Sequence, residues 1–300
     1  MRNFGAFASL TTLLSRITLI LGFCILFPAI ANAQLQHGTV VVFIVSTNRV
    51  IVTADSRALG PGNLSSDDAC KITALGTQLL FTEAGVSADT HTILISKNWS
   101  IRQEAIRAFS KFQISKSKAD PVDEVSANWL RSVKRIYLRE LESNPQKVLR
   151  SATNGVLMGS SFVGLDRTGQ VKVREIDITF DRAKLEKTGV PTLTVNSQLW
   201  DIVDQPVIKI IGHAEIIKEF RQESSERARA EEQRWQLEAN AHRNEDTDLL
   251  YAVFLVDLTS SYAPPEWGVG GPVDEVEVLP KRGIQWIQRK PECSANSRLK

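Results

Sequence analysis

Strand-like apolar runs and helical patterns alternate along this chain in blocks of several elements. Residues 39–45 and 50–54 are almost continuously apolar, which is typical of β-strands that are covered on both faces. The polar residues 46–49 between these runs predict a tight hairpin turn. A second hairpin is predicted over residues 69–82, with its turn at Gly76-Thr77.

Helical patterns follow this first block of strands. Apolar residues recur at helical spacing from Ser87 to Phe109, and Asp120-Pro121 is a typical start signal for a second helix that reaches Leu141. Residues 181–205 are irregular apart from one short strand pattern. The later predicted elements are strands at 155–165, 170–180, 192–199 and 207–211, a helix from 214, a charged and solvated helical stretch at 221–248, an apolar helix at 249–258 and a hairpin at 273–279 and 283–288.

The order of these blocks predicts the fold class. Blocks of strands separated by pairs of helices favour an α+β domain in which two antiparallel sheets pack face to face. Helices would then cover the outer faces, which gives a four-layer αββα sandwich. No repeat or low-complexity linker divides residues 39–290, so we expect one domain there and a C-terminal tail at 291–300.

Composition argues against some classes of partner. The chain of 300 residues has a formal net charge of +2, and its first 33 residues carry two of the 36 basic side chains and none of the 34 acidic ones. The remainder is therefore balanced in charge, which argues against a nucleic-acid partner. The four histidines and three cysteines show no metal-ligand spacing, and we predict neither a metal nor a cofactor.

The N-terminus has the pattern of a signal peptide. Arg2 and Arg16 accompany an apolar run at 17–30, and Ala31-Asn32-Ala33 matches a small-x-small cleavage site. We therefore expect residues 1–33 to direct export, so that the protein is periplasmic or secreted. A membrane anchor is the alternative, although the run is short for spanning a bilayer. No later run reaches about 18 apolar residues, so no membrane contact is expected after signal cleavage.

Two cysteines remain after removal of the signal peptide, which takes Cys24 with it. Cys70 and Cys293 could pair in an oxidising compartment, but two cysteines do not form a disulfide framework. We predict two separate thiols.

The first candidate for chemistry is Thr39, which opens the first strand directly after Gly38. A hydroxyl is a weak nucleophile until a base accepts its proton, and the chain has no Gly-x-Ser-x-Gly elbow. An N-terminal threonine carries its own base, because an α-amino group has a pKa of about 7.7–8.0. Cleavage of the Gly38–Thr39 bond would expose this amine and release residues 34–38 as a propeptide. Glycine suits the cut position because it permits unusual backbone geometry.

Four residues in register resemble the pattern of a known family. They are Thr39 after Gly38, Asp55 in the segment Asp55-Ser56-Arg57-Ala58, Lys71 and Gly85, separated by 16, 16 and 14 residues. This pattern resembles a proteasome β-type subunit, a threonine peptidase of the N-terminal nucleophile (Ntn) hydrolase superfamily. The resemblance covers most of residues 38–289 and weakens after Asp89.

The resemblance implies a role for each of these residues. Thr39 would attack the scissile carbonyl, with its own amino group as the general base. Lys71 would ease proton loss from the hydroxyl, and Asp55 would pair with Lys71 and orient it. The amide of Gly85 would stabilise the oxyanion, an interaction of roughly 2.7–4 kcal/mol per donor. Glu83 would line the substrate pocket and favour a basic substrate side chain.

Each residue also has a structural interpretation. Thr39 can simply start a strand, Asp55 can be a turn acid, Lys71 a surface lysine, Gly85 a helix-entry glycine and Glu83 a solvent-facing strand residue. The later chain also departs from the family pattern. Gly270-Gly271 precedes the last hairpin as expected, but no clear Asp or Ser precedes that pair. His213 stands where the family has a supporting serine, as either a helix-start residue or a supporting donor.

We therefore expect an exported, self-processing threonine peptidase that cleaves amide bonds in peptides. One alternative is an Ntn amidohydrolase that acts on a small amide. Another is a catalytically degenerate proteasome-like binding or structural protein, which the missing late Asp and Ser favour. A homo-oligomer is compatible with the resemblance, but a ring is not assumed, because an exported protein lacks the usual cytoplasmic partners.

Overall fold

The computed structural model describes residues 38–59, 65–67, 69–86, 88–89, 99–146, 148, 152, 155–222, 225–290 and 293. The chain separates into units 1–33 and 34–300, and the elements below belong to the second unit. The predicted signal peptide, nearly all of the propeptide and most of the C-terminal tail lie outside the described residues, as does Ser87, the predicted start of the first helix.

The first sheet contains the first two strands of the domain as interior strands. Its five strands are antiparallel in the order β12-β1-β2-β13-β14. They are β1 (Val40–Val45), β2 (Val50–Ala54), β12 (Val207–Gly212), β13 (Asp274–Leu279) and β14 (Gly283–Gln288). Every residue of β1 and β2 is buried, as their continuous apolar character predicts.

The second sheet is also antiparallel and has the order β11-β10-β9-β6-β5. Its strands are β5 (Ile72–Ala74), β6 (Leu79–Gly85), β9 (Val156–Leu165), β10 (Val171–Phe180) and β11 (Leu193–Leu199). Two short ribbons complete the strands: β3 (Ala58–Leu59) pairs with β4 (Ser65–Ser66), and β7 (Ala88–Asp89) pairs with β8 (Trp99–Ser100).

Helices follow the strand blocks, with two departures from the prediction. The helix predicted from Ser87 begins only at Ile101, because residues 88–89 and 99–100 pair as strands and Ser100 caps the helix start. The helices are α2 (Ile101–Ser115), α3 (Pro121–Ser143), α5 (Arg182–Thr188), α6 (Glu215–Gln222), α7 (Glu226–Ala241) and α8 (Thr247–Tyr262), with a 3₁₀ turn η4 at Pro265–Trp267. Asp120 caps α3 and Pro121 occupies its first turn, which confirms that start signal. The prediction of irregular structure near residue 181 is wrong, because Asp181 caps α5 and Gly189 ends it in the left-handed conformation.

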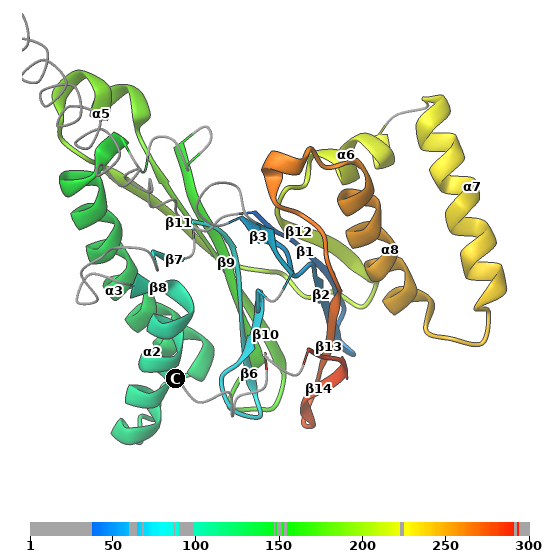
Figure 1. The fold of residues 1–300 in the computed structure, drawn as a ribbon. Helices are drawn as coiled ribbons and strands as arrows, with labels where there is room; N and C mark the ends of the chain where they lie inside the picture. The colour runs from blue at the N-terminus through cyan, green and yellow to red at the C-terminus, as the bar shows by residue number, and fades with distance from the viewer. Residues whose placement is uncertain are drawn as a thin grey trace, which may run out of the picture. The chain divides into compact units, whose positions relative to one another are not determined.

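Figure 1 shows the two sheets with helices beside them. Three hydrophobic clusters connect these sheets and helices. One joins α2 and α3 to the second sheet and contains Trp129, Tyr137 and Phe162. Another contains residues of both sheets, such as Phe43 and Leu80, so the sheets pack against each other. The last joins α6 and α8 to the first sheet. The chain is therefore an α+β protein whose two antiparallel sheets carry helices on opposite sides.

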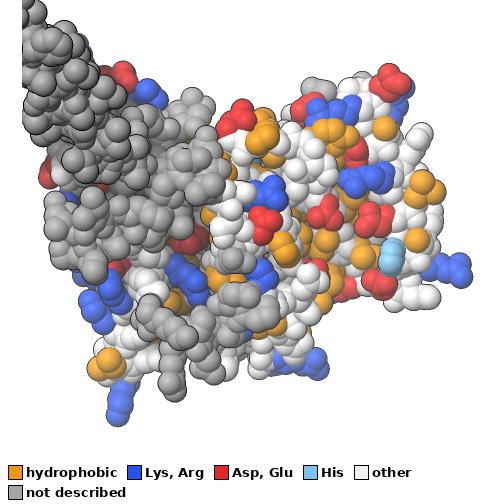
Figure 2. Space-filling model, in the orientation of Figure 1, with side chains coloured by type: hydrophobic (Ala, Val, Ile, Leu, Met, Phe, Trp, Pro, Cys, Tyr) orange, Lys and Arg blue, Asp and Glu red, His pale blue; other side chains and the backbone are white. Residues whose placement is uncertain are grey.

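The charged stretch at 221–248 is largely solvated helix, as predicted. In α7 only Ala228 is buried, although Trp235 packs on Phe254 of α8. Acidic and basic side chains are intermixed on the face formed by this part of the molecule (Figure 2). None of the helices in the described part of the chain is long and apolar enough to cross a bilayer.

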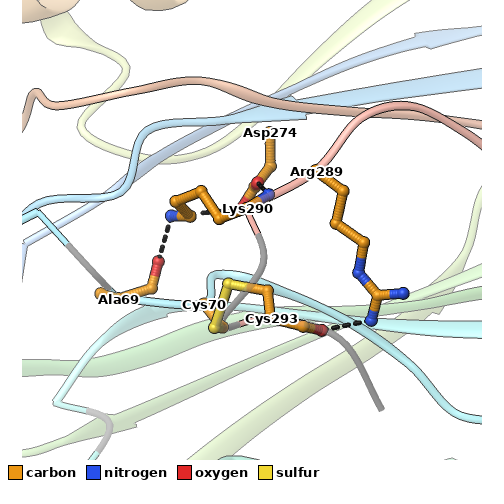
Figure 3. The surroundings of a disulfide bond; sticks show 6 residues. All are labelled: Ala69, Cys70, Asp274, Arg289, Lys290 and Cys293. Atoms are coloured by element: carbon orange, nitrogen blue, oxygen red, sulfur yellow. Dashed lines mark hydrogen bonds and ion pairs between the residues drawn. A yellow bond between two sulfur atoms is a disulfide. The ribbon is translucent and has the colours of Figure 1, made fainter. Parts of the chain in front are cut away.

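The prediction of two separate thiols is wrong. Cys70 and Cys293 form a disulfide across a sequence separation of 223 residues (Figure 3). The cause is tertiary: β13 pairs with β2, and β14 then returns the C-terminal segment to the beginning of β5, where Cys70 lies. Pattern alone gives no signal for such a pairing, because the two cysteines lie in unrelated local contexts.

Candidate active site

Thr39 lies at the entrance of β1 and is almost fully buried, with 1% of its surface exposed. Its hydroxyl donates a hydrogen bond to the carbonyl oxygen of the preceding residue, Gly38. Its own carbonyl accepts a hydrogen bond of 3.0 Å from the backbone N–H of His213. The Thr39 side chain is therefore held against the peptide group that joins it to Gly38.

Lys71 reaches the same peptide group from the second sheet. It directly precedes β5, and its Nζ donates a 2.6 Å hydrogen bond to the carbonyl oxygen of Gly38. The side chain is only 3% exposed, which rejects the interpretation of Lys71 as a surface lysine. The Gly38 carbonyl thus accepts from a hydroxyl and from an amine at once, and both donors polarise its C=O bond.

Asp55 follows β2 and holds the backbone around Thr39 in place. Oδ1 accepts from the N–H of Val40 at 2.9 Å, and Oδ2 accepts from Gly270 at 3.0 Å and Arg57 at 3.3 Å. Asp55 was predicted to pair with Lys71, but no ion pair within 4.0 Å joins these two described residues. Lys71 acts on Asp55 through space, and Asp55 acts on Thr39 through its neighbour Val40.

The three ionisable groups of the site are buried together, and burial dominates their pKa values. It raises the pKa of the Asp55 carboxyl to about 6, although the charge of Lys71 and the three amide donors oppose the rise. It lowers the pKa of the Lys71 ammonium, which Asp55 and Glu83 oppose. It also raises the pKa of Glu83 to about 7, against the charges of Lys71 and Arg102.

Glu83 is a buried neighbour of Lys71 and does not face solvent. Its backbone N–H donates to the carbonyl of Lys71 at 3.2 Å, so the two residues pair across the start of β5 and the end of β6. One carboxylate oxygen, Oε2, has no hydrogen-bond partner among the described residues. A buried, unpartnered carboxylate oxygen is costly unless another group satisfies it.

Gly85 ends β6 with a φ of +108°, and a Cβ built there would lie 2.5 Å from the carbonyl oxygen of Leu157. Ala84, the residue before Gly85, lies close to Gly212. A Cβ built on Gly212 would lie 3.1 Å from the Ala84 methyl group and 2.2 Å from the carbonyl oxygen of Thr39. The end of β6 therefore lies near the entrance of β1. Glycine is required at Gly85 by its approach to β9 and at Gly212 by its approach to Thr39.

The sequence did not predict two contacts of the site, the hydrogen bonds of Gly270 and the stacking of His213 on Trp267. The amide of Gly270 is a donor to Asp55, while its carbonyl accepts from the N–H groups of Ser56 and Arg57. The His213 ring stacks on Trp267, with centroids 4.5 Å apart. The Gly270-Gly271 pair was a visible signal for the first feature. Nothing in the local sequence signals the second, which depends on how η4 folds back over β12.

The electrostatics of His213 follow from this position. Burial lowers the pKa of its imidazole, Glu215 opposes that effect, and the charge of Lys71 lowers the pKa further. The ring is therefore within electrostatic reach of Lys71, beside a backbone that hydrogen-bonds Thr39. Within the described ranges, no group of three or more His, Cys, Asp or Glu side chains is arranged to hold a metal ion.

Comparisons with known proteins add no relative. No protein-family model matches the chain, and no curated protein is significantly similar to it in sequence. A functional assignment therefore depends on the chemistry of the site: a threonine hydroxyl and a buried lysine donate to one carbonyl, and a buried carboxylate holds the neighbouring backbone.

Proposed function

We propose that this protein is a self-processing threonine hydrolase of the Ntn type, with peptides as substrates. One observation carries the proposal: the carbonyl of Gly38 accepts hydrogen bonds from both the Thr39 hydroxyl and Lys71 Nζ. The packing of helices, sheet, sheet and helices is compatible with the αββα fold of that superfamily. The four residues in register supply the family pattern.

The first reaction would be cleavage of the chain itself. Thr39 Oγ adds to the carbonyl carbon of Gly38 as its proton leaves, and Lys71 stabilises the negative charge that develops on the carbonyl oxygen. The C–N bond then breaks, the Thr39 nitrogen takes up a proton, and Gly38 is left as an ester on Oγ. Water hydrolyses this ester to the Gly38 carboxylate and regenerates the hydroxyl, which leaves a free amine on Thr39.

The second reaction would repeat this chemistry on a substrate amide. The free amine of Thr39 accepts the proton of its hydroxyl, and Oγ forms an ester with the acyl part while the amine part leaves. Lys71 lowers the energy of the developing alkoxide, and the amide of Gly85 donates to the oxyanion. Water then hydrolyses the ester. Asp55 contributes by fixing Val40, so the nucleophile keeps its direction during both steps.

Export is part of the proposal. The signal-peptide pattern at 1–33 would carry the chain out of the cytoplasm, and a disulfide between Cys70 and Cys293 suits an oxidising compartment. In such a compartment the Gly38–Thr39 bond would be cut after the signal peptide has been removed. No nucleic acid, metal or cofactor has a role in this scheme.

The N-terminus of the mature protein tests the proposal. We expect protein purified from the exported fraction to begin at Thr39, as measured by intact mass and N-terminal sequencing. A chain that begins at Gln34 and stays uncut on incubation contradicts the threonine mechanism and supports the non-catalytic alternative. If the chain is processed, turnover of small amides but not of peptides would instead identify an amidohydrolase.

Glu83 predicts a pH-dependent substrate preference. Because its pKa is about 7, the carboxylate form accumulates above neutral pH. We expect kcat/KM for peptides with Lys or Arg before the cleaved bond, relative to Leu, to rise as the pH passes through this value. Glu83→Gln should remove the rise and reduce the preference by roughly tenfold or more, the effect of losing a hydrogen bond to a charged group. A preference that is unchanged in Glu83→Gln contradicts the pocket assignment.

A further inference from the structure

The segment after β14 is attached at two points to the backbone that carries Lys71. Lys290 Nζ donates a 2.7 Å hydrogen bond to the carbonyl of Ala69, and Cys293 is disulfide-bonded to Cys70 (Figure 3). Ala69 and Cys70 are the two residues immediately before Lys71. We refer to Lys290 and Cys293 as the C-terminal anchors.

The first anchor is itself fixed from the opposite side. Asp274 is fully buried at the start of β13, and it accepts a 3.0 Å hydrogen bond from the backbone N–H of Lys290. Lys290 Nζ also lies 3.2 Å from the second oxygen of this carboxylate. Asp274 pairs with Ala54, the residue before Asp55. Lys290 therefore bridges the strand that leads to Asp55 and the segment that leads to Lys71.

The anchors hold the backbone before Lys71, whereas its side chain has few polar contacts of its own in the described part of the chain. Within the described part of the chain, its side chain donates one hydrogen bond, to the carbonyl oxygen of Gly38. Its backbone carbonyl accepts from Glu83, and the preceding residues are held by Lys290 and Cys293. Burial and the nearby charge of Lys290 both act on the ammonium of Lys71.

We propose that the C-terminal anchors are positioning residues for Lys71, so that self-processing and turnover require an oxidised Cys70–Cys293 disulfide and an intact Lys290. The inference rests on the proposed function for its kinetic consequences. Reduction by a dithiol would transfer two electrons and two protons to the disulfide, which gives two thiols and a cyclic disulfide of the reagent. The segment before Lys71 would then lose its covalent anchor.

The experiment compares exported wild-type protein with three variants. Cys293→Ser removes the covalent anchor and Lys290→Gln removes the polar one. Arg282→Gln is the matched control, because it deletes a basic side chain at the exposed turn of the hairpin β13–β14, which precedes Lys290. Processing at Gly38–Thr39 is followed by intact mass, and the Lys71 ammonium is titrated by NMR with ¹³C-labelled lysine. Circular dichroism establishes which variants are folded, so that Lys290→Gln tests the inference even if Cys293→Ser does not fold.

We expect processing to slow by about tenfold or more in Cys293→Ser and Lys290→Gln and to be unchanged in Arg282→Gln. The titration midpoint of Lys71 should rise in both anchor variants, since one gains solvent and the other loses a neighbouring positive charge. Folded anchor variants that match wild type in rate and in Lys71 titration overturn the inference. If wild type is not processed but the Lys71 midpoint still rises in both variants, the proposed function fails while the positioning role stands.

Discussion

Replacement of Thr39 by alanine should leave a folded protein that neither cuts its own chain nor hydrolyses peptides. The hydroxyl is the only group proposed to form a bond to carbon in both reactions, so its loss should reduce turnover by a factor on the order of 10⁴ or more. The fold should survive because the Gly38 carbonyl keeps its hydrogen bond to Lys71. Intact mass reports on processing, and fluorogenic peptides report on turnover.

A matched control for this variant lies on the neighbouring strand. Thr53 is a fully buried threonine of β2 whose hydroxyl has no hydrogen-bond partner in the part of the chain that the structure describes. Thr53→Ala therefore removes the same atoms from the same sheet without touching the Gly38–Thr39 bond, and it should be processed normally. Thr39→Ser should retain both activities at a reduced rate. Unchanged peptide turnover in Thr39→Ala would move the chemistry to another residue.

The sequence predicted the parts of the fold that depend on local pattern. The continuous apolar runs of β1 and β2 required cover on both faces, and the structure buries every residue of both strands. The Asp120-Pro121 signal placed the start of α3 correctly. That Thr39 and Lys71 both donate to the Gly38 carbonyl could be expected only from the resemblance to the Ntn hydrolases, because the two residues precede strands of different sheets.

Features that depend on long-range packing were beyond prediction from the sequence. Asp55 was expected to pair with Lys71, but its oxygens accept from the amides of Val40, Arg57 and Gly270. Every residue except proline has a backbone N–H, so the sequence does not show whether Asp55 accepts from such groups or pairs with Lys71. The disulfide was not predicted because Cys293 reaches Cys70 only after the last hairpin has paired with β2.

Gly38→Ala should block self-processing while leaving the catalytic residues unchanged. Gly38 has a φ of +97°, and a Cβ there would lie 2.3 Å from the carbonyl oxygen of Trp267 and 2.6 Å from that of Gly268. Backbone atoms cannot yield as a flexible side chain would, so the Gly38 carbonyl must leave its place between Thr39 and Lys71. We expect processing, followed by intact mass, to slow by at least about a hundredfold, as misplacement of a reacting group by about 1 Å can cause.

Two controls separate the steric block from general strain and from loss of catalysis. Gly189 also has a positive φ, +68°, but a Cβ there would have nothing within 4 Å. Gly189→Ala therefore carries the conformational cost, on the order of 1–3 kcal/mol, without a clash at the site, and it should be processed normally. If the bond before Thr39 of Gly38→Ala is cut by an added protease, the freed Thr39 should hydrolyse peptides at the wild-type rate. A Gly38→Ala chain that processes as fast as wild type would show that the geometry around the Gly38 carbonyl does not govern cleavage, because that variant cannot keep this geometry.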